Sequence, residues 1–327
     1  MPGLITHYIC GQAVLNTLPE RDKQRLLSNR QLYNIGSQGP DIFFYYLPAL
    51  IRDQLVGLGS KMHKGGVRSF IHNMVVGLEK LPEPEKDAVF AYLCGYLTHY
   101  ALDASAHPYI YYKTGFRQKG KPIKGIRYSI YHRNFETSLD TLMLKLTTSE
   151  KPRDVKLWQL IKTTKKEARS VSKVIGRSIK KTYGVPVSGK LAYRAMFYMS
   201  SITRLLQSRS GKRKILMEFA EDFTIGKGYF SSLIHEQEVK DGIDYLNLRK
   251  ENWFMPWDNK TIMNHTFVEM FERAIDDSLE MINALSAYLR NEITMRQLLC
   301  ITGNNSLATG LDSGQKVEFA YSDVVYR

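Results

Sequence analysis

The segment Leu97-Thr-His-Tyr-Ala-Leu-Asp-Ala-Ser-Ala-His-Pro108 decides the fold. His99, Asp103 and His107 are spaced four residues apart, so a helix places all three on one face. Residues 92–100 are mostly leucine and tyrosine apart from the histidine, which predicts that this helix is buried. Because a buried ionisable side chain is costly unless it is paired or metal-bound, the pattern indicates a metal site inside a helical protein.

A second segment, Tyr131-His-Arg-Asn-Phe-Glu136, repeats the spacing with His132 and Glu136. Zinc accepts imidazole nitrogen and carboxylate oxygen at about 2.0–2.2 Å. Two such helices facing each other would supply five ligands, enough for more than one ion. His265 and Glu269 have the same spacing, but their surroundings are those of an ordinary amphipathic helix, and we assign them to the surface.

Helical periodicity dominates the chain, and few stretches alternate with a period of two, so the sequence predicts an all-α fold. A helix is expected to stop before Pro108, because proline lacks the N–H group that a helix interior needs. Helices are expected at residues 11–27, 42–58 with a break at Pro48, 65–81, 86–106, 128–147, 153–183, 189–208, 213–223 and 259–290. Residues 113–127 and the segment from Gly303 onward are expected to be loops.

The length of 327 residues favours two parts. Residues 1–150 hold the histidine and acid pattern and form the first predicted domain. Residues 151–327 form a helical extension of unknown role that we expect to pack on the first part.

Charge is concentrated in the middle of the chain. Residues 113–214 contain 26 Lys and Arg against 5 Asp and Glu, a net charge of +21, whereas residues 215–327 have a net charge of −8. Such a block can attract anionic lipid or nucleic acid, or it can be a solvated face balanced by the acidic third.

Several patterns are missing from the sequence. It has no signal-peptide pattern at its start and no run of the roughly 20 apolar residues that a membrane span needs, which predicts a cytoplasmic protein. Cys10, Cys94 and Cys300 are far apart and are expected to be reduced. There is no Ser-His-Asp pattern, and residues 36–39 lack the lysine of a phosphate-binding loop.

The two histidine segments resemble the zinc-dependent phospholipase C family, which includes secreted bacterial phospholipases C and is more distantly similar to single-strand-specific zinc nucleases. Members are helical bundles with three zinc ions in a cleft. Their central helix carries His-xxx-Asp and a further His, matched by residues 99–107, and a second helix carries His-xxx-Glu, matched by residues 132–136. Glu136 favours the phospholipase branch, since the nuclease branch has Asp there.

The resemblance extends towards the N-terminus. The family's Thr-His is matched by Thr6-His7, and its Asp in a small-residue turn is matched by Asp41 in Gly36-Ser-Gln-Gly-Pro-Asp41. A single His follows in the family. We assign this ligand to His63, and His72 is the alternative.

The resemblance implies two or three zinc ions. The first would be held by Asp41, His63, His99 and Asp103. The second would be held by His107, His132 and Glu136. The third would be held by His7, Asp103 and the start of the chain. This chain departs from the secreted pattern because it begins Met1-Pro2 in place of an N-terminal Trp, and because His107 follows Asp103 by four residues instead of six.

The implied activity is hydrolysis of a phospholipid head-group phosphodiester by zinc-activated water, with Asp41 orienting or deprotonating the water. The expected partners are a phospholipid or other phosphodiester substrate and, peripherally, an anionic membrane. Two alternatives stay open: a zinc nuclease, favoured by the basic middle third, and a metal-stabilised protein without catalysis.

Overall fold

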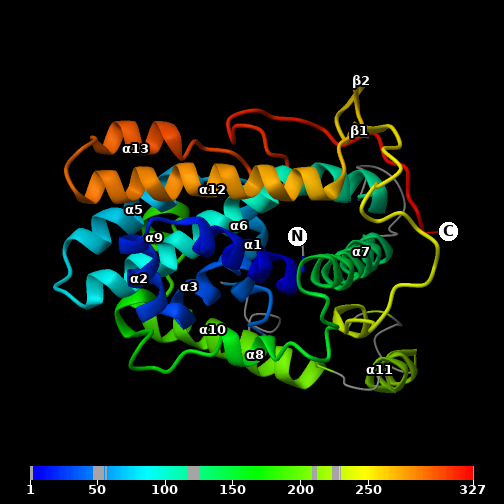
Figure 1. Cartoon of the computed structure of the whole chain (residues 1–327), viewed down its shortest axis with the longest axis horizontal. Coiled ribbons are helices and arrows are strands. Elements are labelled where there is room, and N and C mark those ends of the chain that lie inside the picture. The colour runs from blue at the N-terminus through cyan, green and yellow to red at the C-terminus, as the bar shows by residue number, and fades with distance from the viewer. Residues whose placement is uncertain are drawn as a thin grey trace.

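The computed structural model describes residues 3–46, 55, 57–116, 125–207, 212–222, 228 and 230–326. A single long helix, α6 (Glu85–Thr114), passes through the middle of the molecule and is buried over most of its length (Figure 1). Its sequence is apolar on nearly every side, as expected of a helix that other elements surround. The structure confirms the all-α prediction: in the described part of the chain the one sheet is a two-stranded hairpin.

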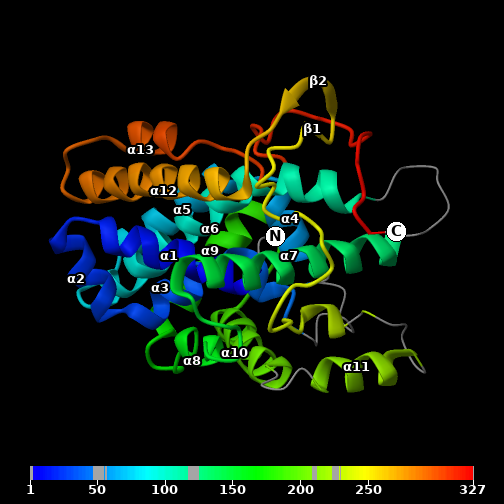
Figure 2. The ribbon, with the colours of Figure 1, turned by 45° about the vertical axis from the view of Figure 1, so that its right-hand side comes forward.

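Helices from both ends of the chain pack around α6. These helices are α1 (Leu4–Thr17), α2 (Glu20–Ser28), α3 (Arg30–Gly36), α5 (Val67–Glu79), α7 (Gly125–Thr148), α9 (Arg169–Tyr183) and α12 (Phe267–Leu289). Helix α12 lies along α6 in two views of the molecule (Figures 1 and 2). The remaining elements are the short helical turn η1 (Gly39–Phe43), α4 (Leu58–Lys64), α8 (Leu157–Leu160), α10 (Gly189–Leu206), α11 (Lys212–Asp222), η3 (Ser231–Leu233), β1 (Trp253–Met255), β2 (Asp258–Met263) and α13 (Met295–Ile301).

Two glycines let α3 cross α6 at close range. A Cβ atom on Gly36 would lie 2.3 Å from the Tyr92 carbonyl oxygen, and one on Gly95 would lie 2.1 Å from the Tyr33 carbonyl oxygen. Any side chain at either position would therefore push the helices apart. The close crossing brings the turn η1, which carries Asp41, against the histidine face of α6.

The expectation that α6 stops before Pro108 is wrong. Proline stands inside the helix, which continues to Thr114. The carbonyl of Ala104, which loses its helical donor at this proline, is covered by the C-terminal loop, since a Cβ atom on Gly310 would lie only 2.3 Å from that oxygen. The C-terminal loop therefore packs closely against α6 at the proline.

Other predicted boundaries also need correction. The expected helix 11–27 is two helices that meet at Leu18-Pro19, and 153–183 contains only the short α8 and then α9. Residues 258–263 form strand β2, so the expected helix 259–290 begins only at Phe267, and α13 was not predicted. The predicted break at Pro48 and most of the predicted loop 113–127 lie outside the described residues.

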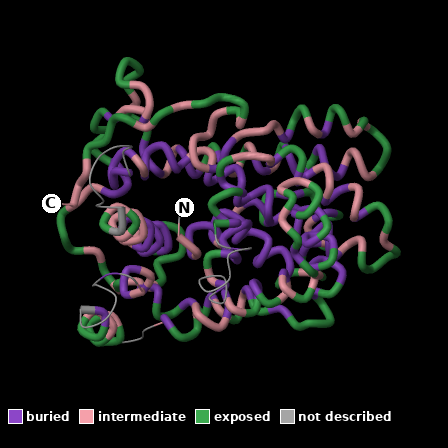
Figure 3. Tube along the Cα trace, turned by 180° about the vertical axis from the view of Figure 1, so that it is seen from behind, coloured by how far each residue is buried: buried purple, intermediate pink, exposed green. Residues whose placement is uncertain are grey.

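The hydrophobic core includes residues on both sides of position 150, such as Phe90, Leu139, Ile175 and Phe271. Buried segments run through the middle of the molecule, whereas the hairpin and α11 at the periphery are largely exposed (Figure 3). No helix in the described ranges is long and apolar enough to span a bilayer. The three cysteines are free, with Cys10 and Cys94 buried and Cys300 exposed.

Candidate metal centre

Five of the predicted ligands meet on one face of α6. His7 comes from α1, Asp41 from η1 and His63 from α4, and they converge on His99 and Asp103 of α6. All five side chains are buried. Residues far apart in the sequence are therefore brought to one place by the helix crossings described above.

Asp103 lies at the centre of this group. Its Oδ1 is 3.2 Å from His7 Nε2, and its Oδ2 is 3.2 Å from His63 Nε2 and 3.0 Å from His99 Nε2. Two ligands bound to one tetrahedral zinc at about 2.0–2.1 Å lie roughly 3.3 Å apart. The separations therefore match those of ligands that share an ion.

Asp41 approaches the same group from η1. Its Oδ1 is 3.3 Å from His63 Nε2 and 3.9 Å from His99 Nε2. A Cβ atom on Gly39 would lie 2.3 Å from the His99 ring, and Gly39 has a φ of +51°, so a glycine is needed where the turn meets the histidine. The small-residue turn thus lets Asp41 reach the helix.

These ligand atoms lack hydrogen-bond partners although they are buried. The unpaired atoms are Asp41 Oδ1, His7 Nδ1, His7 Nε2, His63 Nε2, His99 Nε2 and both carboxylate oxygens of Asp103. Buried polar atoms are rarely left unpaired, and each costs about 1–3 kcal/mol when it is. A metal ion at this position would satisfy them, so the donor set fits zinc.

Backbone carbonyls fix three of the histidine rings. The Nδ1 atoms of His63, His99 and His107 donate to the carbonyl oxygens of Gly59 at 2.6 Å, Ser37 at 3.2 Å and Leu307 at 2.5 Å, respectively. Such bonds select the tautomer that leaves Nε2 available and orient the ring, as they do around metal-bound histidines.

A second group lies between α6 and α7. His107, His132 and Glu136 each offer a ligand atom, and these atoms lie within 4.8 Å of one another. His132 Nε2 is 2.7 Å from Glu136 Oε1, and the ring of Tyr111 packs against both His107 and His132. This trio is the one expected from the sequence for a second ion.

Electrostatics favour the protonation states that bind metals. Burial lowers the pKa of His107 and His132 well below the ordinary value, so both rings are neutral. Burial alone would raise the pKa of Asp103, but the neighbouring His99, His107, His63 and His7 hold it well below its usual range. The carboxylate is therefore ionised.

The pKa of His63 is shifted in the opposite direction to those of His107 and His132. Burial lowers its pKa, but the carboxylates of Asp103 and Asp41, 3.2 and 3.3 Å from its Nε2, outweigh burial and raise the pKa to about 9. Without a metal, this ring holds a proton between the two carboxylates at neutral pH. A metal ion that binds His63 would displace that proton.

Asp140, which the sequence analysis did not single out, ties the N-terminus to α7. It is fully buried and accepts hydrogen bonds from the N–H groups of Ile5 at 3.0 Å and Thr6 at 2.7 Å, from the Thr6 hydroxyl at 2.6 Å and from His235 Nε2 at 2.7 Å. The carboxylate caps the start of α1, one residue before His7. Its position four residues after Glu136, on the same helical face, was the available signal.

The C-terminal loop also supports the centre. Besides the Leu307 carbonyl on His107, the Ser306 hydroxyl and the Ala308 N–H donate to the His63 carbonyl at 3.0 and 3.2 Å. No motif in residues 303–312 indicated this role, because backbone groups supply most of the contacts.

His72 and His265, which were also considered from the sequence, lie outside both groups. His72 is half-buried on α5 and belongs to neither group. His265 is exposed and precedes α12, where Glu269 completes the capping box with Thr266. The start of the chain, assigned to the third ion, lies outside the described residues.

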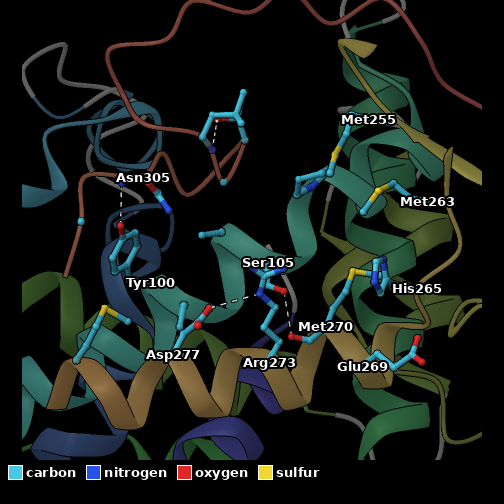
Figure 4. A pocket seen from close by; sticks show the side chains of 18 of the residues that line it. Tyr100, Ser105, Met255, Met263, His265, Glu269, Met270, Arg273, Asp277 and Asn305 are labelled. Atoms are coloured by element: carbon cyan, nitrogen blue, oxygen red, sulfur yellow. Dashed lines mark hydrogen bonds and ion pairs between the residues drawn. The ribbon is translucent and has the colours of Figure 1, made fainter. Parts of the chain in front are cut away.

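A cavity of about 470 Å³ lies on a different face of α6 from the metal centre. It is lined by Tyr100 and Ser105 of α6, by Arg273 and Asp277 of α12, and by methionines of the hairpin (Figure 4). None of the eight predicted ligands lines it. The cavity is therefore separate from the histidine and acid groups.

Comparison with known proteins identifies the family. No curated protein and no solved structure matches the chain. A family model described as zinc dependent phospholipase C matches residues 6–185, which is more than half of the chain and includes every predicted ligand. With its buried histidine and acid groups on the central helix, this chain belongs to the zinc dependent phospholipase C family.

Proposed function

We propose that the protein hydrolyses the head-group phosphodiester of a phospholipid with the help of two or three zinc ions. The family match and the unpaired buried atoms around Asp103 support this proposal. The family is zinc-dependent, and the described residues include three groups of His, Asp and Glu that could hold metal ions.

The proposed ligand sets draw on the residues of these groups, in which His7 also lies close to Asp41 and His99. Asp41, His63, His99 and Asp103 hold one ion, and His107, His132 and Glu136 hold another. His7 and Asp103 contribute to a third. Asp103 is the proposed bridge, because each of its oxygens faces a different histidine.

Each protein group has a proposed role in the reaction. Zinc, when bound, supplies Lewis-acid activation of water and charge neutralisation of the phosphodiester. We assign to Asp41 the role of orienting the attacking water and accepting its proton, because its Oδ1 lies 3.3 Å from His63 Nε2 and 3.9 Å from His99 Nε2, beside the proposed zinc position. The carbonyls of Gly59, Ser37 and Leu307 hold the histidine rings in place during turnover.

The basic middle third supports a second candidate substrate. Its net charge of +21 would attract single-stranded nucleic acid as well as an anionic membrane. Glu136, in the position where the nuclease branch has Asp, favours the phospholipid. We also retain the cytoplasmic location as a prediction.

Turnover of nitrophenyl phosphocholine tests the proposal. The zinc-loaded protein should release nitrophenol, and chelation should abolish the release. Glu136→Gln should lose activity, because it removes a carboxylate from a three-ligand group, while its helical circular dichroism persists. Glu272→Gln, an exposed change on α12, is the matched control and should retain full activity.

Two outcomes would redirect the assignment. Release of nucleotides from single-stranded RNA or DNA with no activity on phosphatidylcholine would favour the nuclease. Stoichiometric zinc without turnover on any phosphodiester or phospholipid would reject catalysis and leave a metal-stabilised protein.

A further inference from the structure

Helix α11 has its apolar residues on the outside. Ile215, Leu216 and Phe219 share one side of the helix and are 71%, 70% and 65% exposed. Helix α11 lies at the edge of the molecule in both ribbon views (Figures 1 and 2). We call these three side chains the α11 apolar face.

The polar side of the same helix faces inward. Glu221 is 2% exposed and accepts hydrogen bonds from the Ser231 N–H at 3.0 Å, the Ser231 hydroxyl at 2.7 Å and the Gly228 N–H at 2.9 Å, and also from the Phe230 N–H. Lys214 Nζ lies 2.6 Å from a carboxylate oxygen of Glu236. These contacts hold the helix in an orientation opposite to that of an ordinary surface helix.

The start of α11 is fixed as well. Arg213 Nη1 donates to the carbonyl oxygens of Leu205 at 3.0 Å and Gln207 at 2.8 Å, which closes the end of α10. The helix is therefore anchored at its first turn by Arg213 and at its last turn by Glu221. These two anchors hold the helix with Ile215 and Leu216 facing outward.

Charge and area indicate which kind of partner suits this face. The exposed cations Lys212 and Arg213 stand beside it, Arg204 is exposed on the adjoining helix α10, and the nearby carboxylate of Glu221 is turned inward. The three side chains alone make a small apolar patch, whereas a stable protein interface buries about 800 Å² on each partner. A few large apolar residues bordered by cations suit the interface of an anionic bilayer instead.

We propose that α11 inserts its apolar face, Ile215, Leu216 and Phe219, into the surface of an anionic phospholipid membrane and so docks the protein there. The choice of a lipid surface rests on the proposed phospholipid substrate, but the docking itself requires no hydrolysis. The membrane-binding element is thus assigned to a helix outside residues 6–185, which match the family model.

Sedimentation of the full chain with vesicles of phosphatidylserine and phosphatidylcholine tests the proposal. The double variant Ile215→Ser, Leu216→Ser should bind at least about tenfold more weakly than the wild type, because two apolar side chains no longer leave water. The matched control is Leu248→Ser, Ile262→Ser, whose side chains are 63% and 61% exposed elsewhere. It should bind like the wild type.

A second variant reports the position of the helix. Subtracting the wild-type emission spectrum from that of Phe219→Trp gives the emission of the new tryptophan. This emission should shift to shorter wavelength when anionic vesicles are added. The proposal would be overturned if the wild-type protein does not bind these vesicles. It would also be overturned if the double variant binds them as well as the control variant does. If the wild type is a dimer and the double variant is a monomer, a second copy of the chain covers this face. That result would also overturn the proposal.

Hydrolysis separates this inference from the proposed function. Vesicle binding without turnover of nitrophenyl phosphocholine would overturn only the function. Turnover of that soluble substrate without vesicle binding would overturn only the docking. If both hold, the double variant should keep its activity on the soluble substrate and lose activity on vesicles.

Discussion

At the residue scale, Asp103 is the centre of the proposed metal site. The sequence predicted its partners on α6 from spacing alone, because a helix fixes which residues share a face. It could not choose between His63 and His72 by spacing, since that choice depends on how short helices pack. The structure brings His63 to within 3.2 Å of Asp103 and leaves His72 on α5 outside both groups.

Replacement of the central carboxylate should have a large effect. Asp103→Asn removes the charge that faces His7, His63 and His99, so we expect the zinc content to fall by about one ion per chain or more. Metal analysis after dialysis measures this. The exposed His265→Ala should retain all zinc, and equal losses in both variants would contradict the central role of Asp103.

The raised pKa of His63 predicts a pH dependence. In the metal-free protein, the stabilising effect of this proton is complete below about 6.5 and is lost as pH rises through about 9. Zinc competes with the same proton, so its affinity should continue to rise above pH 7, by about tenfold per unit until the pKa is reached. Titration against a competing chelator measures this, and an affinity that is constant above pH 7 would contradict it.

At the scale of the elements, sequence periodicity predicted most helices but not how they end or what covers them. Pro108 argued for a helix end, yet α6 continues to Thr114, and the loop at Gly310 packs closely over the freed Ala104 carbonyl. The support of His107 by Leu307 could not be predicted either, and the spacing of Asp140 from Glu136 indicated only the face of α7 that they share, not the contact of Asp140 with α1. Both contacts join segments that are more than a hundred residues apart in the sequence. In the contact with His107, Leu307 contributes only its backbone carbonyl.

Asp140 should matter for both folding and metal binding. Asp140→Asn cannot accept all four hydrogen bonds, and we expect the free energy of unfolding to fall by about 2 kcal/mol. The start of α1 should also loosen and take His7 away from Asp103. Chemical denaturation and zinc analysis measure the two effects, with the exposed Asp276→Asn as control. A variant as stable and as zinc-rich as that control would contradict the anchoring role.

At the scale of the whole molecule, the chain joins an all-α core to a strongly basic middle third. Length suggested a boundary near residue 150, but the core includes residues from both sides, and the C-terminal loop reaches His63 and His107. We therefore propose that residues 151–327 are needed for the first part to fold. A chain that ends at residue 150 should show no cooperative unfolding by heat. A cooperative transition with bound zinc would contradict this.

The net charge of +21 on residues 113–214 predicts salt-sensitive binding of the protein to anionic vesicles. Binding should weaken between about 0.1 M and 1 M salt, since the Debye length falls from about 10 Å to about 3 Å. Sedimentation over this range measures the trend. Equal binding at both salt concentrations would show that the basic third does not attract the membrane.

A zinc-edge anomalous map of crystals of the zinc-loaded protein tests the central claim most directly. The account predicts two or three peaks. One should lie among Asp41, His63, His99 and Asp103, and another among His107, His132 and Glu136. A map with no peak in either group, or with zinc only at exposed residues such as His265, would contradict the account.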